Sequence, residues 1–285
     1  MSNLIVQFKE QTNEIIFLKD SPLVQCITNE ITCESMANAL LYIGAKPIMA
    51  DDSREFKELF QQTDALLLNL GRLSVEREKN LRQAANYARE TEKPTVVDLV
   101  GVTATKWRFD IGHALLEQHP QVVKGNLSEM RAFCQLATKG RGVDGSTSDQ
   151  SDIAISELVV ALHTLTHSYP ETIFLATGPT DIVVNQGGTY YLKNGVPELD
   201  AFTGTGDIVG AMIAAFLGDE YSAIEATILA VSYFNLCGEQ AKNLGGNQQG
   251  LADFRHQTLN QLSLLKEQPQ WTSGIKGAYQ SWNEV

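Results

Sequence analysis

AFTGTGDIVGAMIAAFLG, residues 201–218, places two glycines and an aspartate directly before a run of small and apolar side chains. The run has the length of a helix and ends at Gly218, a residue type that commonly stops helices. Asp207 then lies in the first turn, where unpaired backbone N–H groups and the helix dipole favour negative charge. The simplest interpretation of this stretch alone is a capped helix in the protein core, because short glycine motifs often match by chance. The remainder of the chain decides whether it also belongs to a site.

Strand-like apolar runs alternate with amphipathic segments of helix length before this stretch. The strands have little alternation, so we expect helices to cover both faces of a mostly parallel central sheet in an α/β domain. The predicted strands are residues 23–28, 46–50, 65–70, 95–100, 121–125 and 172–177. The predicted helices between them are residues 33–44, 53–62, 74–92, 109–118 and 128–137.

The second half of the chain continues this domain without a linker or an internal repeat. Residues 181–195 contain two short apolar runs about a glycine pair, which predicts an antiparallel hairpin. Helices are predicted at residues 223–242 and 252–266, and the segment 139–152 is the best candidate for a mobile surface loop. We therefore predict a single domain over residues 1–285, with residues 1–20 as a candidate for a poorly ordered extension.

The charge of the chain limits its partners. The formal net charge is -12 and the sequence pI is about 4.9, so the field of the whole protein repels nucleic acids. An anionic ligand would need local cations, a metal ion or backbone N–H groups aimed at it. No window reaches the ~18 apolar residues of a membrane span, and the polar N-terminus does not match a signal peptide. These features predict a cytoplasmic protein with no membrane partner.

Cysteine and histidine spacing indicates no metal centre. The four cysteines show no C-x-x-C pair, and we expect reduced, mostly buried thiols at Cys26, Cys33, Cys134 and Cys237. The HTLTH segment at residues 163–167 lacks the glutamate that follows the first histidine of a zinc-protease helix. Ordinary surface or partly buried histidines explain it better.

Polar residues follow five predicted strands in succession. In open α/β sheets, ligands bind outside the carboxyl ends of the strands, so this repetition indicates a site. A single polar strand end would mean little, since strands run into polar loops. The residues are Thr28, Asn29, Asn69, Gly71, Asp98, Lys124, Asn126, Glu129, Thr177 and Gly178.

These residue types are suited to phosphoryl transfer. Backbone N–H groups at a glycine-rich helix start can bind phosphate oxygens without net positive charge on the protein. Asp98 and Glu129 can hold Mg²⁺ through its waters, and Lys124 can pair with a phosphate. Asp207 can accept the proton of an attacking hydroxyl. The chain contains no P-loop motif.

Six collinear segments make a resemblance specific. Residues 21–56, 65–74, 94–108, 122–130, 176–184 and 202–218 resemble the hydroxyethylthiazole kinase family of the ribokinase-like superfamily. The similarity runs from about Ser21 to Leu217, and the C-terminal helices are compatible with it. It implies a ribokinase-like layered fold, a homotrimer with active sites between subunits, and ATP with Mg²⁺ as the phosphoryl donor.

The resemblance assigns the nucleotide and metal roles residue by residue. It implies ATP contacts at Lys124, where arginine is more usual, and at Thr177. Magnesium-site carboxylates are implied at Asp98 and Glu129. Glu129 closes the superfamily's Asn-x-x-Glu pattern, which begins at Asn126 and adds that residue to the nucleotide site.

The resemblance also implies an alcohol site. Asp207 stands in the slot beside the substrate hydroxyl, where many relatives have cysteine and the wider superfamily has aspartate as the catalytic base. The segment with Asn29 and Ile31 matches a thiazole pocket formed between subunits. The implied substrate contacts are Met49, Gly204, Asn29, Ile31 and Gly71.

Three residues depart from the family pattern. Leu99 replaces the proline of DPVG, and Gln25 stands where histidine is frequent. Arg72 stands where a small hydroxyl residue is common. A cation near the pocket can alter which alcohol is accepted.

The sequence thus predicts transfer of the γ-phosphoryl group of ATP to the primary hydroxyl of 4-methyl-5-(2-hydroxyethyl)thiazole in thiamine salvage. A kinase for another small alcohol, or an ATP-dependent dehydratase of the same superfamily, is an alternative. A non-catalytic nucleotide or metabolite sensor is an alternative of another class. The presence of Asp98, Glu129 and Asp207 together argues against a sensor, which needs no base.

Overall fold

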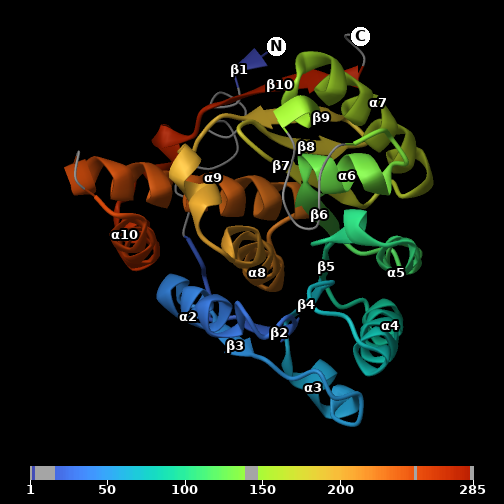
Figure 1. Ribbon diagram of the computed structural model, residues 1–285. Helices are drawn as coiled ribbons and strands as arrows, with labels where there is room; N and C mark the ends of the chain where they lie inside the picture. Colours follow the sequence, from blue (N-terminus) through green and yellow to red (C-terminus); the bar gives the residue numbers. More distant parts are fainter. Residues whose placement is uncertain (1, 4–16, 139–146, 247–248, 283–285) are drawn as a thin grey trace.

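A computed structural model describes residues 2–3, 17–138, 147–246 and 249–282. One sheet runs through the molecule between two helical layers (Figure 1). In the described residues it has ten strands in the order β1-β10-β9-β8-β7-β6-β5-β4-β2-β3. The strands are β1 Ser2–Asn3, β2 Leu23–Ile27, β3 Lys46–Ile48, β4 Ala65–Asn69, β5 Thr95–Asp98, β6 Val122–Asn126, β7 Ile173–Thr177, β8 Asp181–Asn185, β9 Gly188–Leu192 and β10 Gly277–Ser281.

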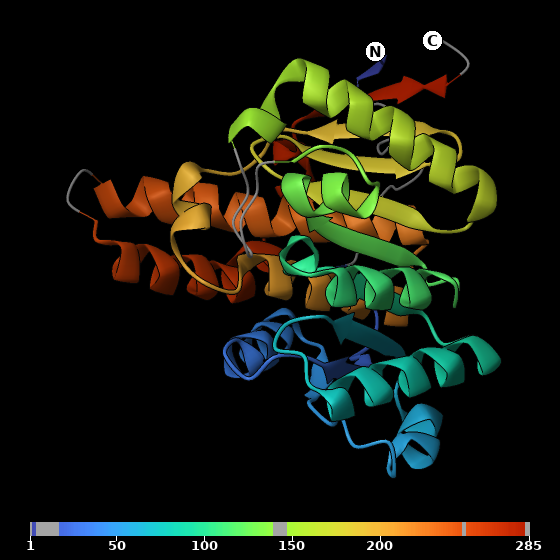
Figure 2. The same cartoon turned by 45° about the vertical axis from the view of Figure 1, so that its right-hand side comes forward.

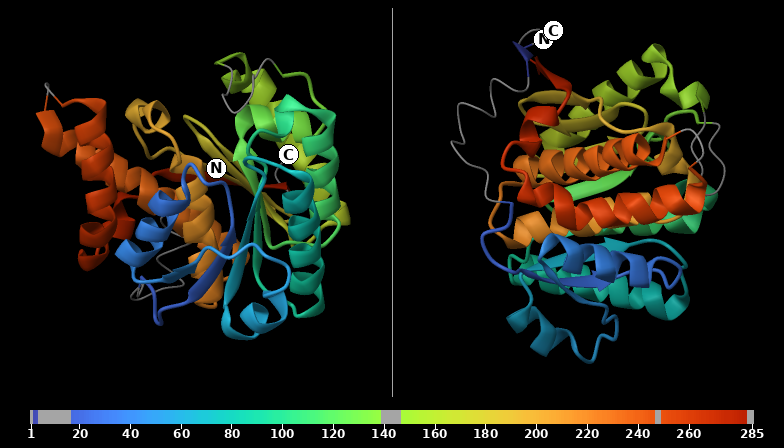
Figure 3. Two further views of the ribbon diagram at one scale, coloured as in Figure 1. Left: turned by 60° about the horizontal axis from the view of Figure 1, so that its bottom comes forward. Right: turned by 90° about the vertical axis from the view of Figure 1, so that its left-hand side faces the viewer.

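The sheet is parallel on the side that carries the site. Strands β3, β2, β4, β5, β6 and β7 pair in parallel, and β8, β9, β10 and β1 extend the sheet in antiparallel pairing. The first and last described strands lie side by side, because β1 pairs with β10 (Figure 3, right). The predicted α/β class and the mostly parallel sheet with helices on both faces are confirmed.

Helices cover both faces of the sheet (Figure 3, left). One layer contains α2 Cys33–Ile43, α8 Thr205–Gly218, α9 Ala223–Gly245 and α10 Leu251–Leu264, which share one apolar core with the sheet. The other contains α3 Phe56–Gln62, α4 Val75–Glu90, α5 Lys106–Leu116, α6 Leu127–Phe133 and α7 Asp152–Ser168. Helices α4 to α7 lie along the same face of the sheet (Figure 2). Among the described residues, no helix has the length and apolar character to cross a membrane.

Helix α8 is central to the first layer, which explains its composition. It packs on β2, β4 and β5 and is flanked by α2 and α9, and its side chains from Asp207 to Leu217 are buried. A Cβ on Gly210 would lie 3.3 Å from Leu67 and 3.5 Å from Asp98. The small side chains therefore let the helix lie close to the strands that carry the site.

Several elements were absent from the sequence prediction. Helix α7 and strands β1 and β10 were not expected, although β10 pairs with β9 over its whole length. The expected loop at 139–152 is wrong for its last part, because residues 147–150 form a 3₁₀ helix and Asp149 is buried. Its carboxylate accepts a hydrogen bond from Ser128 at 2.6 Å. Residues 139–146 of that prediction lie outside the described residues.

The first described segment after β1 packs against the end of α8. Phe17 is buried, and the backbone N–H groups of Lys19 and Asp20 donate to Asp219 at 2.8 and 2.9 Å. The chain is therefore anchored at residues 17–20. The rest of the extension expected at residues 1–20 lies outside the described residues, apart from the backbone of β1.

Candidate functional site

Most of the polar residues that follow the strands line one cavity of about 930 Å³ at the carboxyl ends of the parallel strands, and Thr28 and Asn69 are buried outside its lining. Strand register places Asn69 beside Asp98, Asp98 beside Lys124, and Asn126 beside Thr177. In the described part of the chain, every residue with a predicted binding or catalytic role lines this cavity except Met49. They are Asn29, Ile31, Gly71, Asp98, Lys124, Asn126, Glu129, Thr177, Gly204 and Asp207.

Asp207 lies in the first turn of α8, and three side chains donate to its carboxylate. Asn69 Nδ2 is 2.8 Å from Oδ1, and Asn29 Nδ2 is 3.2 Å from Oδ2. The Thr32 hydroxyl also donates to Oδ2. Hydrogen bonds to a carboxylate are strong, so these three donors fix the orientation of the Asp207 side chain. Asp207 is thus a buried, oriented acceptor at the cavity wall.

Neighbouring backbone orients two of these donors. The side-chain oxygen of Asn29 accepts from the N–H groups of Ile31 and Thr32 at 3.0 and 3.2 Å. The side-chain oxygen of Asn69 accepts from Gly71 N at 2.9 Å. Each amide therefore presents its NH₂ group to Asp207 rather than its oxygen.

The start of α8 is open to a ligand anion. Its N-cap is Gly204, with a φ of 100°, and no side chain caps the first turn. A Cβ on Gly204 would lie 2.9 Å from Thr32 Cγ2, so this position requires glycine for both conformation and space. A Cβ on Gly206 would lie 3.5 Å from Lys124 Nζ. The lysine ammonium therefore lies beside the glycine-rich turn.

Lys124 and Asp98 form a buried ion pair. Lys124 Nζ is 2.8 Å from Asp98 Oδ2, and both side chains are almost fully buried. Burial raises the pKa of Asp98 from its usual value, although Lys124 opposes this shift. The pair therefore needs further polar partners, which a ligand in the cavity can supply.

Glu129 and Asn126 form a capping box at the start of α6. Glu129 Oε2 accepts from Asn126 N at 2.7 Å, and Glu129 N donates to Asn126 Oδ1 at 2.9 Å. Glu129 Oε1 accepts from Gly101 N at 2.7 Å. Burial raises the pKa of Glu129 to about 7. Its charge is therefore costly at neutral pH, and a nearby cation would stabilise it.

The donor set fits a magnesium ion that keeps most of its own waters. Within the described residues, no group of three or more His, Cys, Asp or Glu side chains could hold a metal. Mg²⁺ commonly uses only one or two protein carboxylates, together with waters and substrate phosphates. Asp98 and Glu129 are two buried carboxylates at the same cavity, and burial raises the pKa of both.

The far side of the cavity is built around Asp181, which sequence reasoning missed. Its carboxylate accepts from Gly178 N at 3.0 Å and from Asn235 Nδ2 at 2.7 Å. It thereby joins the turn after Thr177 to helix α9. Burial raises the pKa of Asp181 to about 7. The only sequence signal was an aspartate at the start of a strand, which is common and unspecific.

The remaining residues that the sequence singled out lie partly at the cavity and partly outside it. Met49 is partly buried against the core of the α8 layer and does not line the cavity in the described structure, so its substrate role stays a prediction. Ile31 lines the cavity and is 77% exposed. Arg72 also lines the cavity, has a φ of 48° and pairs with Glu30. Gln25 and Leu99, which depart from the family pattern, are buried residues outside the lining.

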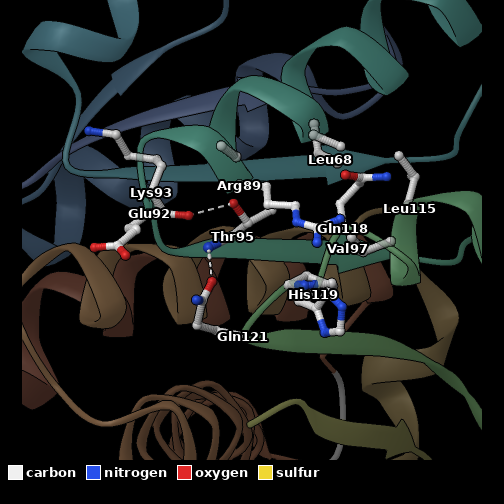
Figure 4. Close-up of a pocket in the computed structure, with 13 residues that line it drawn as sticks. Leu68, Arg89, Glu92, Lys93, Thr95, Val97, Leu115, Gln118, His119 and Gln121 are labelled. Carbon is white, nitrogen blue, oxygen red and sulfur yellow. Dashed lines mark hydrogen bonds between the residues drawn. The ribbon is translucent and has the colours of Figure 1, made fainter. Parts of the chain in front are cut away.

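A smaller cavity lies toward the other end of the strands (Figure 4). It has a volume of about 320 Å³ between α4, α5 and β5. Thr95, the first residue of β5, donates through its N–H to Gln121 at 2.6 Å and through its hydroxyl to Lys93 O at 2.8 Å. Exposed Arg89 and His119 also contribute to the lining. None of the predicted site residues lies there.

Comparison with known proteins shows the family of the chain. The family model described as "Hydroxyethylthiazole kinase family" matches residues 16–268. The chain is 61% identical to a hydroxyethylthiazole kinase of Enterococcus faecalis over 93% of this chain and 96% of that one. It is 62% identical to a hydroxyethylthiazole kinase of Lacticaseibacillus casei over 91% of this chain and 92% of that one.

Solved structures show the same fold. The structure of a hydroxyethylthiazole kinase protein from Pyrococcus horikoshii has a TM-score of 0.78 at 28% identity and covers 91% of this chain and 94% of its own. The pyridoxal kinase from Staphylococcus aureus has a TM-score of 0.58 at 14% identity and covers 92% and 99%, which shows a likeness of fold alone. With its layered fold, its oriented Asp207 and a family match over most of its length, the chain belongs to the hydroxyethylthiazole kinase family.

Proposed function

We propose that the protein transfers the γ-phosphoryl group of ATP to the primary hydroxyl of 4-methyl-5-(2-hydroxyethyl)thiazole. The observation that carries this proposal is the orientation of Asp207 by Asn29, Thr32 and Asn69, beside an uncapped glycine-rich helix start. The names of the similar proteins support the choice of alcohol. Thiamine salvage in the cytoplasm is the process in which we expect this reaction.

The proposed reaction is a single displacement at phosphorus. The substrate oxygen forms a bond to the γ-phosphorus, the bond to the β,γ-bridging oxygen breaks, and its electron pair leaves with ADP. The hydroxyl proton passes to the Asp207 carboxylate. Lys124 and the N–H groups of the first turn of α8 stabilise the negative charge on the phosphoryl oxygens.

Asp98 and Glu129 are the residues that would hold Mg²⁺ through its waters. When bound there, the ion would neutralise part of the negative charge of the phosphates. Lys124 keeps Asp98 oriented by their ion pair, and the backbone N–H groups of Gly101 and Asn126 orient Glu129.

A homotrimer with the alcohol site between subunits is part of the proposal. Ile31 supports it, because a large apolar side chain that is 77% exposed at the rim of a cavity gains from burial against a second subunit. Asn29 and Gly71 lie at the same edge and would complete the alcohol site. Arg72 is also at this edge, and a charged rim favours the alternative of another small alcohol.

The test is direct detection of phosphorylated product by mass spectrometry. The purified protein is incubated with ATP and Mg²⁺ and with each of a panel of thiazole, pyrimidine and pyridine alcohols. We expect the thiazole phosphate and an equal amount of ADP. ADP release with a different phosphorylated alcohol would change the substrate, a dehydrated product would favour the dehydratase, and ATP binding without any product would favour a sensor.

A further inference from the structure

The cationic side chains that line the main cavity differ in whether a carboxylate pairs with them. Among the described lining residues, the lysines and arginines are Arg72, Arg108 and Lys124. Lys124 is paired with Asp98, and Arg72 is paired with Glu30. Arg108 forms no ion pair with any described carboxylate. It is therefore the cavity cation whose charge is least compensated.

Two hydrogen bonds hold the guanidinium of Arg108 in place, and they occupy only some of its N–H donors. Arg108 lies in the first turn of α5, and its Nη1 donates to the carbonyl oxygens of Leu70 and Val100. The second of these distances is 3.2 Å. Both N–H bonds of Nη1 are thereby engaged, while Nε and Nη2 have no hydrogen-bond partner in the described structure. A guanidinium has five N–H donors in a rigid plane, so three of them are available to a ligand.

The two carbonyls place Arg108 on the acceptor side of the cavity. Leu70 directly follows Asn69, which donates to Asp207, and Val100 is two residues beyond Asp98. These residues follow β4 and β5, whereas Thr177 and Asp181 belong to β7 and β8 on the other side of β6. In a nucleotide that extends across the cavity, the terminal phosphoryl group would be the part closest to Arg108.

The cavity is acidic overall, so an anion that binds in it needs a local cation. Its lining contains the carboxylates of Asp98, Glu129, Asp181, Asp200 and Asp207, and the whole chain carries a net charge of -12. Burial lowers the pKa of Arg108, and Glu129 opposes this shift. An arginine keeps its proton at neutral pH even after such a shift. A polyphosphate entering this cavity therefore meets one fixed cation that forms no ion pair with a described carboxylate.

We propose that Arg108 binds the terminal phosphoryl group of the nucleotide, with Nε and Nη2 donating to two of its non-bridging oxygens. The planar fork of arginine matches the spacing of phosphate oxygens and allows two parallel hydrogen bonds. The identification of the ligand as a nucleoside triphosphate rests on the proposed function. The role itself, a cation that binds the end of a polyphosphate, depends only on the geometry of the cavity.

Calorimetric titration of ATP, ADP and AMP tests this assignment, with Mg²⁺ held constant. For Arg108→Gln we expect ATP to bind about 10- to 100-fold more weakly, with changes below about threefold for ADP and AMP. Arg108→Lys should be intermediate, because it keeps the charge and loses the fork. Arg89→Gln is the matched control, since Arg89 is exposed at the smaller cavity (Figure 4), and its three affinities should equal those of the wild type.

The comparison of ATP, ADP and AMP affinities distinguishes phosphate binding by Arg108 from a purely structural role. If Arg108 only holds the loops after β4 and β5, the three nucleotides should weaken together, and that result would overturn the proposal. Unchanged ATP affinity in both variants would overturn it as well. If Arg108→Gln does not fold, Arg108→Lys gives the same comparison. Product formation by the wild type tests the proposed function separately, because the binding series needs no turnover.

Discussion

Asn69 Nδ2 lies 2.8 Å from Oδ1 of Asp207, although the two residues are 138 positions apart in the chain. Asn69 ends strand β4, and Asp207 lies in the first turn of α8. The oxygen of Asn69 accepts from Gly71 N, which leaves its NH₂ group for the carboxylate. This contact gives the carboxylate of Asp207, at the start of α8, a fixed orientation.

Asp207→Asn should lower kcat by roughly 10²- to 10⁴-fold with little change in ATP affinity, because it removes the proton acceptor and keeps the shape. Since Asn69, Asn29 and Thr32 all donate to the carboxylate, the new NH₂ group also meets a donor. We expect unfolding free energy to fall by about 1–3 kcal/mol. Steady-state kinetics and ATP titration measure the two effects.

Asp219→Asn is the control for Asp207. Asp219 is buried at the other end of α8 and accepts from Lys19 N and Asp20 N. Its substitution should lower stability without a fall in kcat. A near-wild-type kcat in Asp207→Asn at saturating ATP and Mg²⁺ would exclude Asp207 as the base.

Lys124→Met should destabilise the protein by about 3–5 kcal/mol, because it leaves the buried Asp98 carboxylate without its partner. The double substitution Lys124→Met with Asp98→Asn should recover most of that stability while ATP binding stays weak. Urea denaturation and KM for ATP provide the two readouts. Lys106→Met, at the exposed pair with Asp110, should cost less than about 1 kcal/mol. Equal costs for the two lysines would contradict a buried pair at Lys124.

Gly204→Ala should reduce both stability and kcat. The left-handed conformation costs about 1–2 kcal/mol for a residue with a Cβ, and that Cβ would contact Thr32, a donor to Asp207. Gly44 has nearly the same φ, and its Cβ would meet only Lys266 Nζ at 3.7 Å. Gly44→Ala should therefore lower stability and leave kcat unchanged.

Substitution of Thr32 separates two effects of Gly204→Ala: the contact of the new Cβ with Thr32, and the strain of a left-handed backbone at position 204. Thr32→Ser removes Cγ2 and keeps the hydroxyl, so combined with Gly204→Ala it should restore part of kcat. No recovery in the double variant would show that the Thr32 contact is not the cause of the loss.

Asp181 should make stability fall as pH rises. Its pKa is about 7 in the folded protein because of burial, against 3.8 without burial, so the folded state binds the proton more tightly. The resulting stabilisation is complete below about pH 4 and is lost as the pH approaches 7. Between these values the wild type should lose on the order of 1 kcal/mol per pH unit more than Asp181→Asn. Chemical denaturation of both proteins at several pH values measures the difference, and parallel curves would contradict the shift.

The order of most strands and helices was predictable because their hydrophobic patterns are strong and local. Helix α7 lacked such a pattern, since it exposes Ile153 and Val160 on its outer face. Strand β10 is short and only partly buried. Both elements depend on neighbours far away in the chain, such as β9 for β10.

The candidate site was predictable to the extent that polar residues follow buried strands. Asp98, Lys124, Asn126 and Thr177 come together because parallel strands end at one edge of the sheet. Arg108 had no such signal, because it lies on a helix and reaches the cavity through contacts with the loops after β4 and β5.

The sequence by itself determined the alternation of elements, the glycine-rich start of α8 and the residue types at the strand ends, because each follows from neighbours within a few positions. Only the tertiary structure decided which charges are neutralised and which donors remain available. Lys124 meets Asp98 across a strand pair, Asp207 meets Asn69 across 138 positions, and Arg108 forms no ion pair with the carboxylates that the structure describes. Such pairings depend on strand register and on how closely α8 packs on the sheet. Neither can be read from a pattern of neighbouring residues in the sequence.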